Sequence, residues 1–169
     1  MRAKADRLPL SAKLHEHIRS GDFVDCFSIE LGEKGTKLSI DDLARSLATT
    51  PPKWAQFLLY LRNILVKPFG LRTEFDGAQT KMGECQPGEL INFFRIYHRD
   101  NNEILMGDDD KHLDYRVSVY RSPSRPSKLY AATWVHRHNW LGHTYLFLIK
   151  PFHKMIVRSM VTGGMRTLG

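Results

Sequence analysis

The sequence predicts an α+β fold in which a curved antiparallel sheet wraps around one long C-terminal helix. Three observations favour it. A first strand is followed by two short helices, several strands then succeed one another, and the chain ends in an amphipathic helix. Helices and strands are thus segregated along the chain, which is typical of α+β proteins. A sheet with one apolar face must be covered, and the terminal helix can cover it.

Residues 22–31 predict the first strand, because apolar and polar positions alternate along them. The apolar positions that share one face are Phe23, Phe27, Ile29 and Leu31. Asp25 lies on that same face and is the odd residue there. We therefore expect a half-buried strand with one carboxylate on its apolar side.

Two short helices follow the first strand. Ser39 can accept hydrogen bonds from the free amides of a helix that begins at Ile40, and Asp42 stands where a capping box has an acid. A second helix begins near Pro51, since proline is tolerated in the first helical turn. Its apolar residues recur at helical spacing. They are Trp54, Phe57, Leu58, Leu61, Ile64 and Leu65.

The middle of the chain predicts a run of strands. Residues 89–98 are apolar and aromatic, and residues 103–106 form a short strand before the aspartate-rich turn at residues 107–111. Residues 112–120 alternate cleanly between apolar and polar positions, and residues 128–139 form the next strand. We expect these strands to pair in antiparallel order.

The terminal helix is predicted from Trp140 toward Val161. Pro151 lies inside it and is expected to kink or restart the helix, because proline cannot donate a backbone hydrogen bond. The stripe expected to face the sheet comprises Leu141, Tyr145, Leu148, Phe152, Met155, Ile156 and Ser159.

The length of 169 residues is that of one domain. Residues 1–20 are polar and are expected to be a loosely attached segment, with residues 21–169 forming the single domain. The basic N-terminus lacks the apolar core of a secretory signal, and no run approaches the roughly 20 apolar residues of a membrane span. The two cysteines, Cys26 and Cys85, form no C-x-x-C pair. We therefore expect reduced thiols and a cytoplasmic protein.

The net charge of +7 is unevenly distributed. Residues 115–169 carry nine basic and no acidic side chains, whereas residues 1–114 carry 16 basic and 18 acidic ones. Such asymmetry is compatible with an interaction module that docks an acidic partner or a membrane surface on the basic half, or with an ordinary solvated face. Nucleic acid binding is not predicted, because no aromatic residues interleave with the lysines in the way stacking platforms require.

Three motifs resemble a bacterial family known as domain of unknown function 2867. They are PPKWAQFLLYLRNILVKPFGL, EILMGDDDKHLDYRVSV and TWVHRHNWLGHTYLFLIKPFHKMIVRSM. The resemblance implies a helix-grip fold of the START-like, birch-pollen-allergen-like kind. Members occur alone or behind a nucleotide-binding short-chain-dehydrogenase domain, which implies a possible protein partner of nucleotide-binding type. The family has no established catalytic residues, and His143 stands here where members often have arginine.

Helix-grip folds often leave an apolar cavity between sheet and helix, and aromatic strands opposite an amphipathic helix suit such a cavity. We therefore expect a module that binds a small hydrophobic molecule, without a cofactor or metal. The residues expected to line the cavity are Phe93, Tyr115, Val117, Trp134, Tyr145, Leu148 and Phe152.

An enzyme of cyclase or hydrolase type in the same cavity is the alternative, with His112, Asp114 and His136 as weak candidates for acid–base work. Strand alternation favours the solvent side for these residues, where Asp114 and Arg116 would form a cross-strand ion pair. The spacing of His136 and His138 occurs in zinc sites, but no H-E-x-x-H motif or cysteine cluster accompanies it. The sequence leaves binding and catalysis open.

Overall fold

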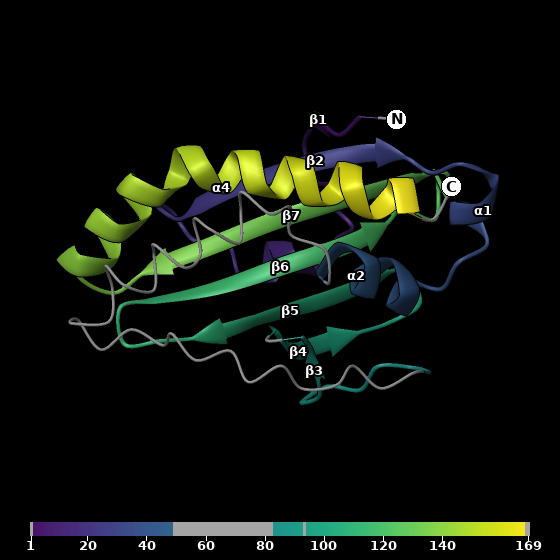
Figure 1. The fold of residues 1–169 in the computed structure, drawn as a ribbon. Coiled ribbons are helices and arrows are strands. Elements are labelled where there is room, and N and C mark those ends of the chain that lie inside the picture. Colours follow the sequence, from purple (N-terminus) through teal and green to yellow (C-terminus); the bar gives the residue numbers. More distant parts are fainter. Residues whose placement is uncertain (1, 49–82, 93, 168–169) are drawn as a thin grey trace.

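The fold is built on a sheet of seven antiparallel strands (Figure 1). The structure, a computed structural model, describes residues 2–48, 83–92 and 94–167. The strands are β1 (Lys4–Ala5), β2 (Phe23–Glu30), β3 (Leu90–Ile91), β4 (Phe94–Arg99), β5 (Glu103–Asp109), β6 (Leu113–Arg121) and β7 (Lys128–Arg137). They lie in the order β1-β2-β7-β6-β5-β4-β3, so the first long strand pairs with the last.

In the described part of the chain, two helices cover one face of this sheet, which we call the inner face. The long helix α4 (Trp140–Thr167) crosses it beside β2 and β7, and α2 (Ile40–Ala48) lies next to it (Figure 1). A single turn, α1 (Glu33–Thr36), connects β2 to α2. The opposite, outer face is partly covered by the N-terminal segment, which contains the 3-10 turn η1 (Lys13–Glu16).

The α+β prediction and its succession of strands are confirmed. The strand predicted over residues 89–98 is divided into β3 and β4, and Asn92 between them has a positive φ of 58°. The helix start at Ser39 is also confirmed: its hydroxyl accepts a hydrogen bond from the Asp42 amide at 3.1 Å. The helix predicted from Pro51 and the side chain of Phe93 lie outside the described residues.

The main core lies between the inner face and the two helices. It joins apolar residues of β2, β5, β6 and β7 to α2 and to the second half of α4. Leu43 of α2, Val119 of β6 and Val161 of α4 are almost fully buried within it. Burying such side chains stabilises the fold by about 1.5–3 kcal/mol each.

The N-terminal segment differs from the loosely attached segment that the sequence predicted. β1 pairs with β2, and Leu14 is fully buried on the outer face. Tyr120, Tyr130 and Trp134 form the apolar surface against which the segment packs. Because the strands present apolar side chains on both faces, both faces must be covered.

The start of α4 is fixed by a close approach to the β5–β6 turn. The Asn139 side chain accepts a hydrogen bond from the Gly142 amide at 3.1 Å and so caps the helix. A Cβ atom on Gly142 would lie 2.2 Å from the backbone oxygen of His112, closer than any atom can approach. The helix then continues through Pro151 as one element, without the restart that we considered.

Substituting alanine for Gly142 is expected to lower the free energy of unfolding by about 2–3 kcal/mol, because the helix must move off the His112 carbonyl. Gly163 in the same helix is the matched control. It has open space around its Cβ position, so Gly163→Ala is expected to stabilise the protein by about 0.5–1 kcal/mol. Urea unfolding of both variants measures the contrast, and equal effects would contradict the close approach.

Candidate functional site

A group of buried polar side chains lies between the inner face and α4. Asp25 of β2 and Thr133 of β7 are direct cross-strand partners, and Val117 of β6 continues the same row. Asp25 reaches the inner face because it alternates in step with Phe23 and Phe27. His153 approaches this row from α4.

Asp25 and His153 are largely buried neighbours that do not form a good hydrogen bond with each other. Their Oδ2 and Nε2 atoms are 3.5 Å apart, and the two side chains are 9% and 22% exposed. That separation allows electrostatic attraction but is too long for a good hydrogen bond. Among the described residues, both carboxylate oxygens of Asp25, the Nε2 atom of His153 and the Thr133 hydroxyl are buried and have no hydrogen-bond partner.

Aromatic and aliphatic side chains surround the pair. The Phe23 ring meets the His153 ring edge-on, with centroids 6.0 Å apart. The next row of the inner face pairs Phe23 with Val135, and Val135 with Tyr115. Leu146 of α4 packs on this row. The polar group therefore sits in mostly apolar surroundings, where charge interactions are stronger than in water.

A cleft of about 420 Å³ opens beside Asp25, between the β1–β2 edge and α4. Lys154 and Arg158 line its helix side, and Asp6 and Asp25 line its strand side. Asp6 is fully engaged, since Lys128 at 2.7 Å and Ser28 at 2.6 Å contact its carboxylate and lower its pKa to about 2. Asp25 is therefore the carboxylate of the cleft that has no hydrogen-bond partner among the described residues.

Of the six described residues predicted to line a cavity, three lie on the sheet-facing side and three do not. Tyr115 and Val117 lie on the inner face as expected, and Tyr145 packs against the same side. Leu148 and Phe152 do not face the sheet, because they are 62% and 46% exposed on the far side of α4. Trp134 lies on the outer face, since its neighbour Val135 takes the inner position opposite Tyr115. 

The three residues proposed for catalysis do not line the cleft between the β1–β2 edge and α4. His136 contacts Asp22 at 2.6 Å on the outer side, and Asp114 contacts His138 at 3.0 Å. His112 lies beside the start of α4, where its Nδ1 atom is within hydrogen-bonding distance of the Asn139 amide group. These residues therefore do not enter the cleft, and the enzyme alternative cannot use them there.

The expected ion pair between Asp114 and Arg116 is also wrong. Arg116 is buried, forms an ion pair with Asp109 at 2.7 Å and stacks on the Tyr97 ring. Asp114 instead pairs with His138. The N-terminal segment explains the burial, because it covers the part of the outer face that was expected to be solvated.

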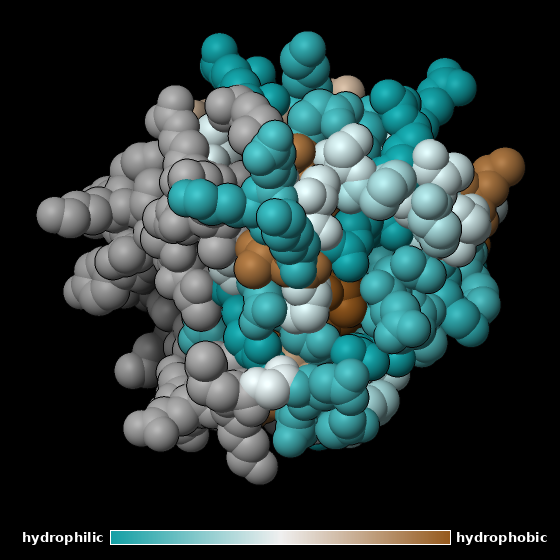
Figure 2. Space-filling view, turned by 90° about the vertical axis from the view of Figure 1, so that its right-hand side faces the viewer, coloured by the Kyte–Doolittle hydropathy of each residue, from teal (hydrophilic) through white to brown (hydrophobic). Residues whose placement is uncertain are grey.

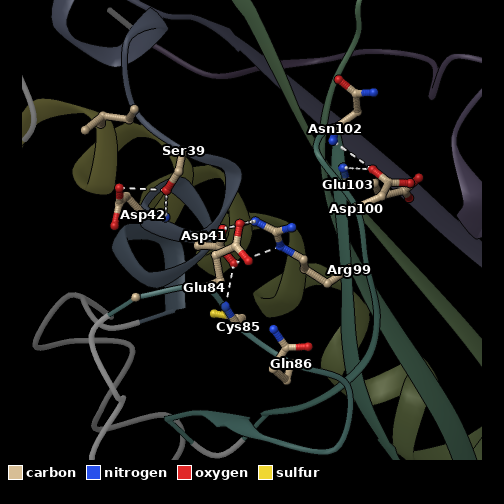
Figure 3. A network of polar contacts seen from close by, with 12 residues as sticks. Ser39, Asp41, Asp42, Glu84, Cys85, Gln86, Arg99, Asp100, Asn102 and Glu103 are labelled. Atoms are coloured by element: carbon tan, nitrogen blue, oxygen red, sulfur yellow. Dashed lines mark hydrogen bonds and ion pairs between the residues drawn. The ribbon is translucent and has the colours of Figure 1, made fainter.

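A second polar network holds α2 to β4 (Figure 3). Arg99 contacts Asp41 at 2.8 Å and Glu84 at 3.2 Å, and the Cys85 amide donates to Asp41 at 2.9 Å. Burial raises the pKa of the Cys85 thiol to about 11, so this thiol is not a ready nucleophile. The polar groups of this network bind one another, so we assign the network a structural role. Among the described residues, no group of three His, Cys, Asp or Glu side chains is placed to hold a metal ion.

Sequence reasoning missed His153 and Thr133 as site residues. One signal was present in the sequence: Asp25 is a charged residue on an otherwise apolar strand face. A buried carboxylate needs a partner, and a polar residue inside the apolar terminal helix could supply it. His153 is such a residue.

A family model described as "Protein of unknown function (DUF2867)" matches residues 17–160. This range covers most of the chain and agrees with the family that the three motifs resemble. No curated protein and no solved structure matches the chain. Within the described ranges, no helix is both long and apolar enough to cross a membrane.

Proposed function

The chain belongs to the DUF2867 family of proteins of unknown function, and we propose that it is a small-molecule-binding module of the helix-grip type. In this proposal the ligand lies between the inner face and α4. The strand order supports a helix-grip arrangement, because pairing of β2 with β7 brings both ends of the strand succession under the terminal helix.

The observation that carries the proposal is the set of unpartnered polar atoms at Asp25, Thr133 and His153. About 90% or more of buried polar groups in native proteins have a hydrogen-bond partner. Leaving one unsatisfied costs about 1–3 kcal/mol. A chain that keeps three such side chains together beside a cleft is best explained if a ligand completes their hydrogen bonds.

The same atoms define the ligand class. An Asp25 carboxylate accepts hydrogen bonds, so the ligand should offer a hydroxyl or amine donor at one end. Part of its remainder should be apolar, because Phe27 and Met155 line the cleft beside Asp25. A cleft of about 420 Å³ lies within the range of small-molecule sites.

The change Asp25→Val tests this proposal. Because it removes an unsatisfied buried carboxylate and suits a strand, it is expected to raise the free energy of unfolding by about 1–3 kcal/mol and to abolish ligand binding. Native mass spectrometry of freshly purified protein measures binding as an added mass. Urea unfolding after extensive dialysis measures stability.

Asp114→Val provides the matched control, since Asp114 is a carboxylate on the outer face with a histidine partner. It is expected to retain the added mass and to gain no stability. Wild-type protein that carries no small molecule, together with a loss of stability in Asp25→Val, would mean that the carboxylate serves packing alone.

The proximity of His153 to Asp25 favours acid–base catalysis in the same cleft as a second candidate function. The two functions differ in one variant. If the protein is an enzyme, His153→Gln should still bind the co-purified molecule but should not convert it, as followed by liquid chromatography and mass spectrometry. If wild-type protein binds the co-purified molecule but does not convert it, the catalytic function is rejected and the binding function stands.

We also propose that the protein acts in a reducing compartment such as the cytoplasm. Both cysteines are free and buried; Cys26 lies on β2, whereas Cys85 lies in the segment before β3, and the two belong to different apolar clusters. Burial raises the pKa of Cys26 to about 12, so this thiol is inert as well. Free, unreactive thiols are what reducing compartments maintain.

A further inference from the structure

We propose that the exposed face of α4 docks on the surface of an anionic lipid bilayer. Five large apolar side chains on this helix are between 46% and 78% exposed. They are Trp140, Phe147, Leu148, Phe152 and Met155, which we call the α4 ridge. Monomeric proteins rarely expose so many large apolar side chains side by side, and such patches mark interaction surfaces.

The α4 ridge follows one side of the helix. At 3.6 residues per turn its members fall within about 140° of one another, and the ridge extends over roughly 22 Å of helix. Leu146, His153 and Val161 project to the opposite, sheet-facing side. The end of the molecule where α4 finishes is mainly hydrophilic, with only small hydrophobic patches (Figure 2). Among the described residues of α4, the exposed large apolar side chains all lie between Trp140 and Met155.

Basic side chains flank this ridge. Lys150, Lys154 and Arg158 follow one another at intervals of four residues, so they form a row along one side of it. All three are exposed. Neither lysine forms an ion pair within the part of the chain that the structure describes. No acidic residue follows Asp114 anywhere in the sequence to offset these charges.

This combination fits a lipid surface better than a second copy of the chain. A two-fold contact through the ridge would bring two identical basic rows together, which repel each other. A bilayer interface accepts a convex helix lying flat, takes up its Trp, Phe and Leu side chains, and attracts lysines through anionic headgroups. Met155 of the ridge lines the cleft, as do Lys154 and Arg158 of the basic row, whereas Trp140, Phe147, Leu148 and Phe152 lie outside it. The inference therefore rests on the exposure and charge of α4 and not on the proposed small-molecule site.

Vesicle co-sedimentation tests the inference with the full chain. We expect binding to vesicles of phosphatidylcholine mixed with phosphatidylglycerol, and much weaker binding to phosphatidylcholine alone. Raising the salt concentration from 0.05 to about 0.5 M should weaken the binding, since the Debye length then becomes shorter than the distance over which the lysines act.

Two double variants separate the apolar and basic contributions. Phe147→Ser with Leu148→Ser should abolish sedimentation with the mixed vesicles. Lys150→Ala with Lys154→Ala should weaken it roughly 30-fold, at about fivefold for each basic residue near an anionic surface. The matched controls are Leu10→Ser, an apolar residue that is 89% exposed elsewhere, and Lys37→Ala with Arg125→Ala. Both controls should bind like wild type.

Trp140 supplies a direct readout, because it begins the ridge and is 74% exposed. Its fluorescence should shift to the blue when mixed vesicles are added, and Trp140→Phe should lose that shift while still sedimenting with the vesicles. Absence of vesicle binding, or equal binding by the ridge variant and wild type, would overturn the inference. So would dimerisation that depends on Phe147 without any lipid binding, since the occupant would then be a second copy.

Discussion

Replacing Arg99 by methionine is expected to lower the free energy of unfolding by about 3–5 kcal/mol. The reason is the charge that it leaves behind. Asp41 is buried, and Arg99 contacts both of its carboxylate oxygens, at 3.3 and 2.8 Å. Methionine keeps much of the packing volume but removes the compensating charge, so the carboxylate would be buried without its partner. Urea unfolding at neutral pH measures the loss.

The pH dependence of this loss identifies its cause. Burial alone would raise the pKa of Asp41, but hydrogen bonds from Arg99 and from the Cys85 amide outweigh it and hold the pKa below its ordinary value of 3.8. The pair therefore contributes stability above pH 3.8 that is lost as the pH falls through the lower folded value. Without Arg99, burial dominates and protonation of Asp41 becomes favourable. The difference between wild type and Arg99→Met should then shrink as the pH is lowered toward 4.

Arg95→Met is the matched control for this experiment. Arg95 lies on the same strand but is exposed. Its replacement should change the free energy of unfolding by no more than about 0.5 kcal/mol. If Arg99→Met were as mild as Arg95→Met, Asp41 would have to be neutral or hydrated in the folded protein, and the network of Figure 3 would not stabilise α2.

The strands could be predicted from the sequence because apolar and polar residues alternate along them with a period of two, which is the side-chain period of a β-strand. Residues 112–120 were predicted as a strand, and β6 covers Leu113–Arg121. The start of α2 could also be predicted, since the Ser39 hydroxyl accepts a hydrogen bond from the Asp42 amide and donates one to the Asp42 carboxylate. These features depend on neighbours a few residues apart, so the local sequence contains the information.

The orientation of α4 could not be predicted, because the helix is apolar around most of its circumference. The sequence favoured a stripe through Leu148 and Phe152, whereas the structure buries Leu146 and Val161. In such a helix the spacing of apolar residues does not indicate which side faces the sheet. The close approach of Gly142 to the His112 carbonyl helps to set the phase, and that contact joins positions 30 residues apart.

The candidate site was hidden for the same reason. Asp25 meets Thr133 through the register of β2 on β7, and it meets His153 only because of how α4 is rotated. No spacing in the sequence connects these three positions. The sequence pattern instead favoured three polar residues on adjacent strands, which lie away from the cleft. They are His112, Asp114 and His136.

One buried carboxylate, Glu103, helps to hold the N-terminal segment on the outer face, and its removal is the second large effect that we expect. Glu103 is almost fully buried on the outer face and accepts hydrogen bonds from the Lys13 amide at 2.5 Å and the Ser118 hydroxyl at 2.6 Å. The Leu14 amide lies at 3.4 Å. Glu103→Ala should lower the free energy of unfolding by about 3–4 kcal/mol, because each buried donor left without an acceptor costs about 1–3 kcal/mol. Hydrogen exchange at the Lys13 and Leu14 amides should accelerate together.

Glu103→Gln distinguishes the hydrogen bonds from the charge. Burial raises the pKa of Glu103 above its ordinary value of 4.5, although the hydrogen bonds it accepts oppose this shift. A raised folded pKa means that the contribution of the protonated acid is fully present below pH 4.5 and is lost as the pH rises through the folded value. Glutamine keeps an acceptor but cannot ionise, so Glu103→Gln should become more stable relative to wild type as the pH rises from 4 to 8. A constant difference across that range would show that Glu103 titrates alike in the folded and unfolded chains, which would contradict the raised pKa.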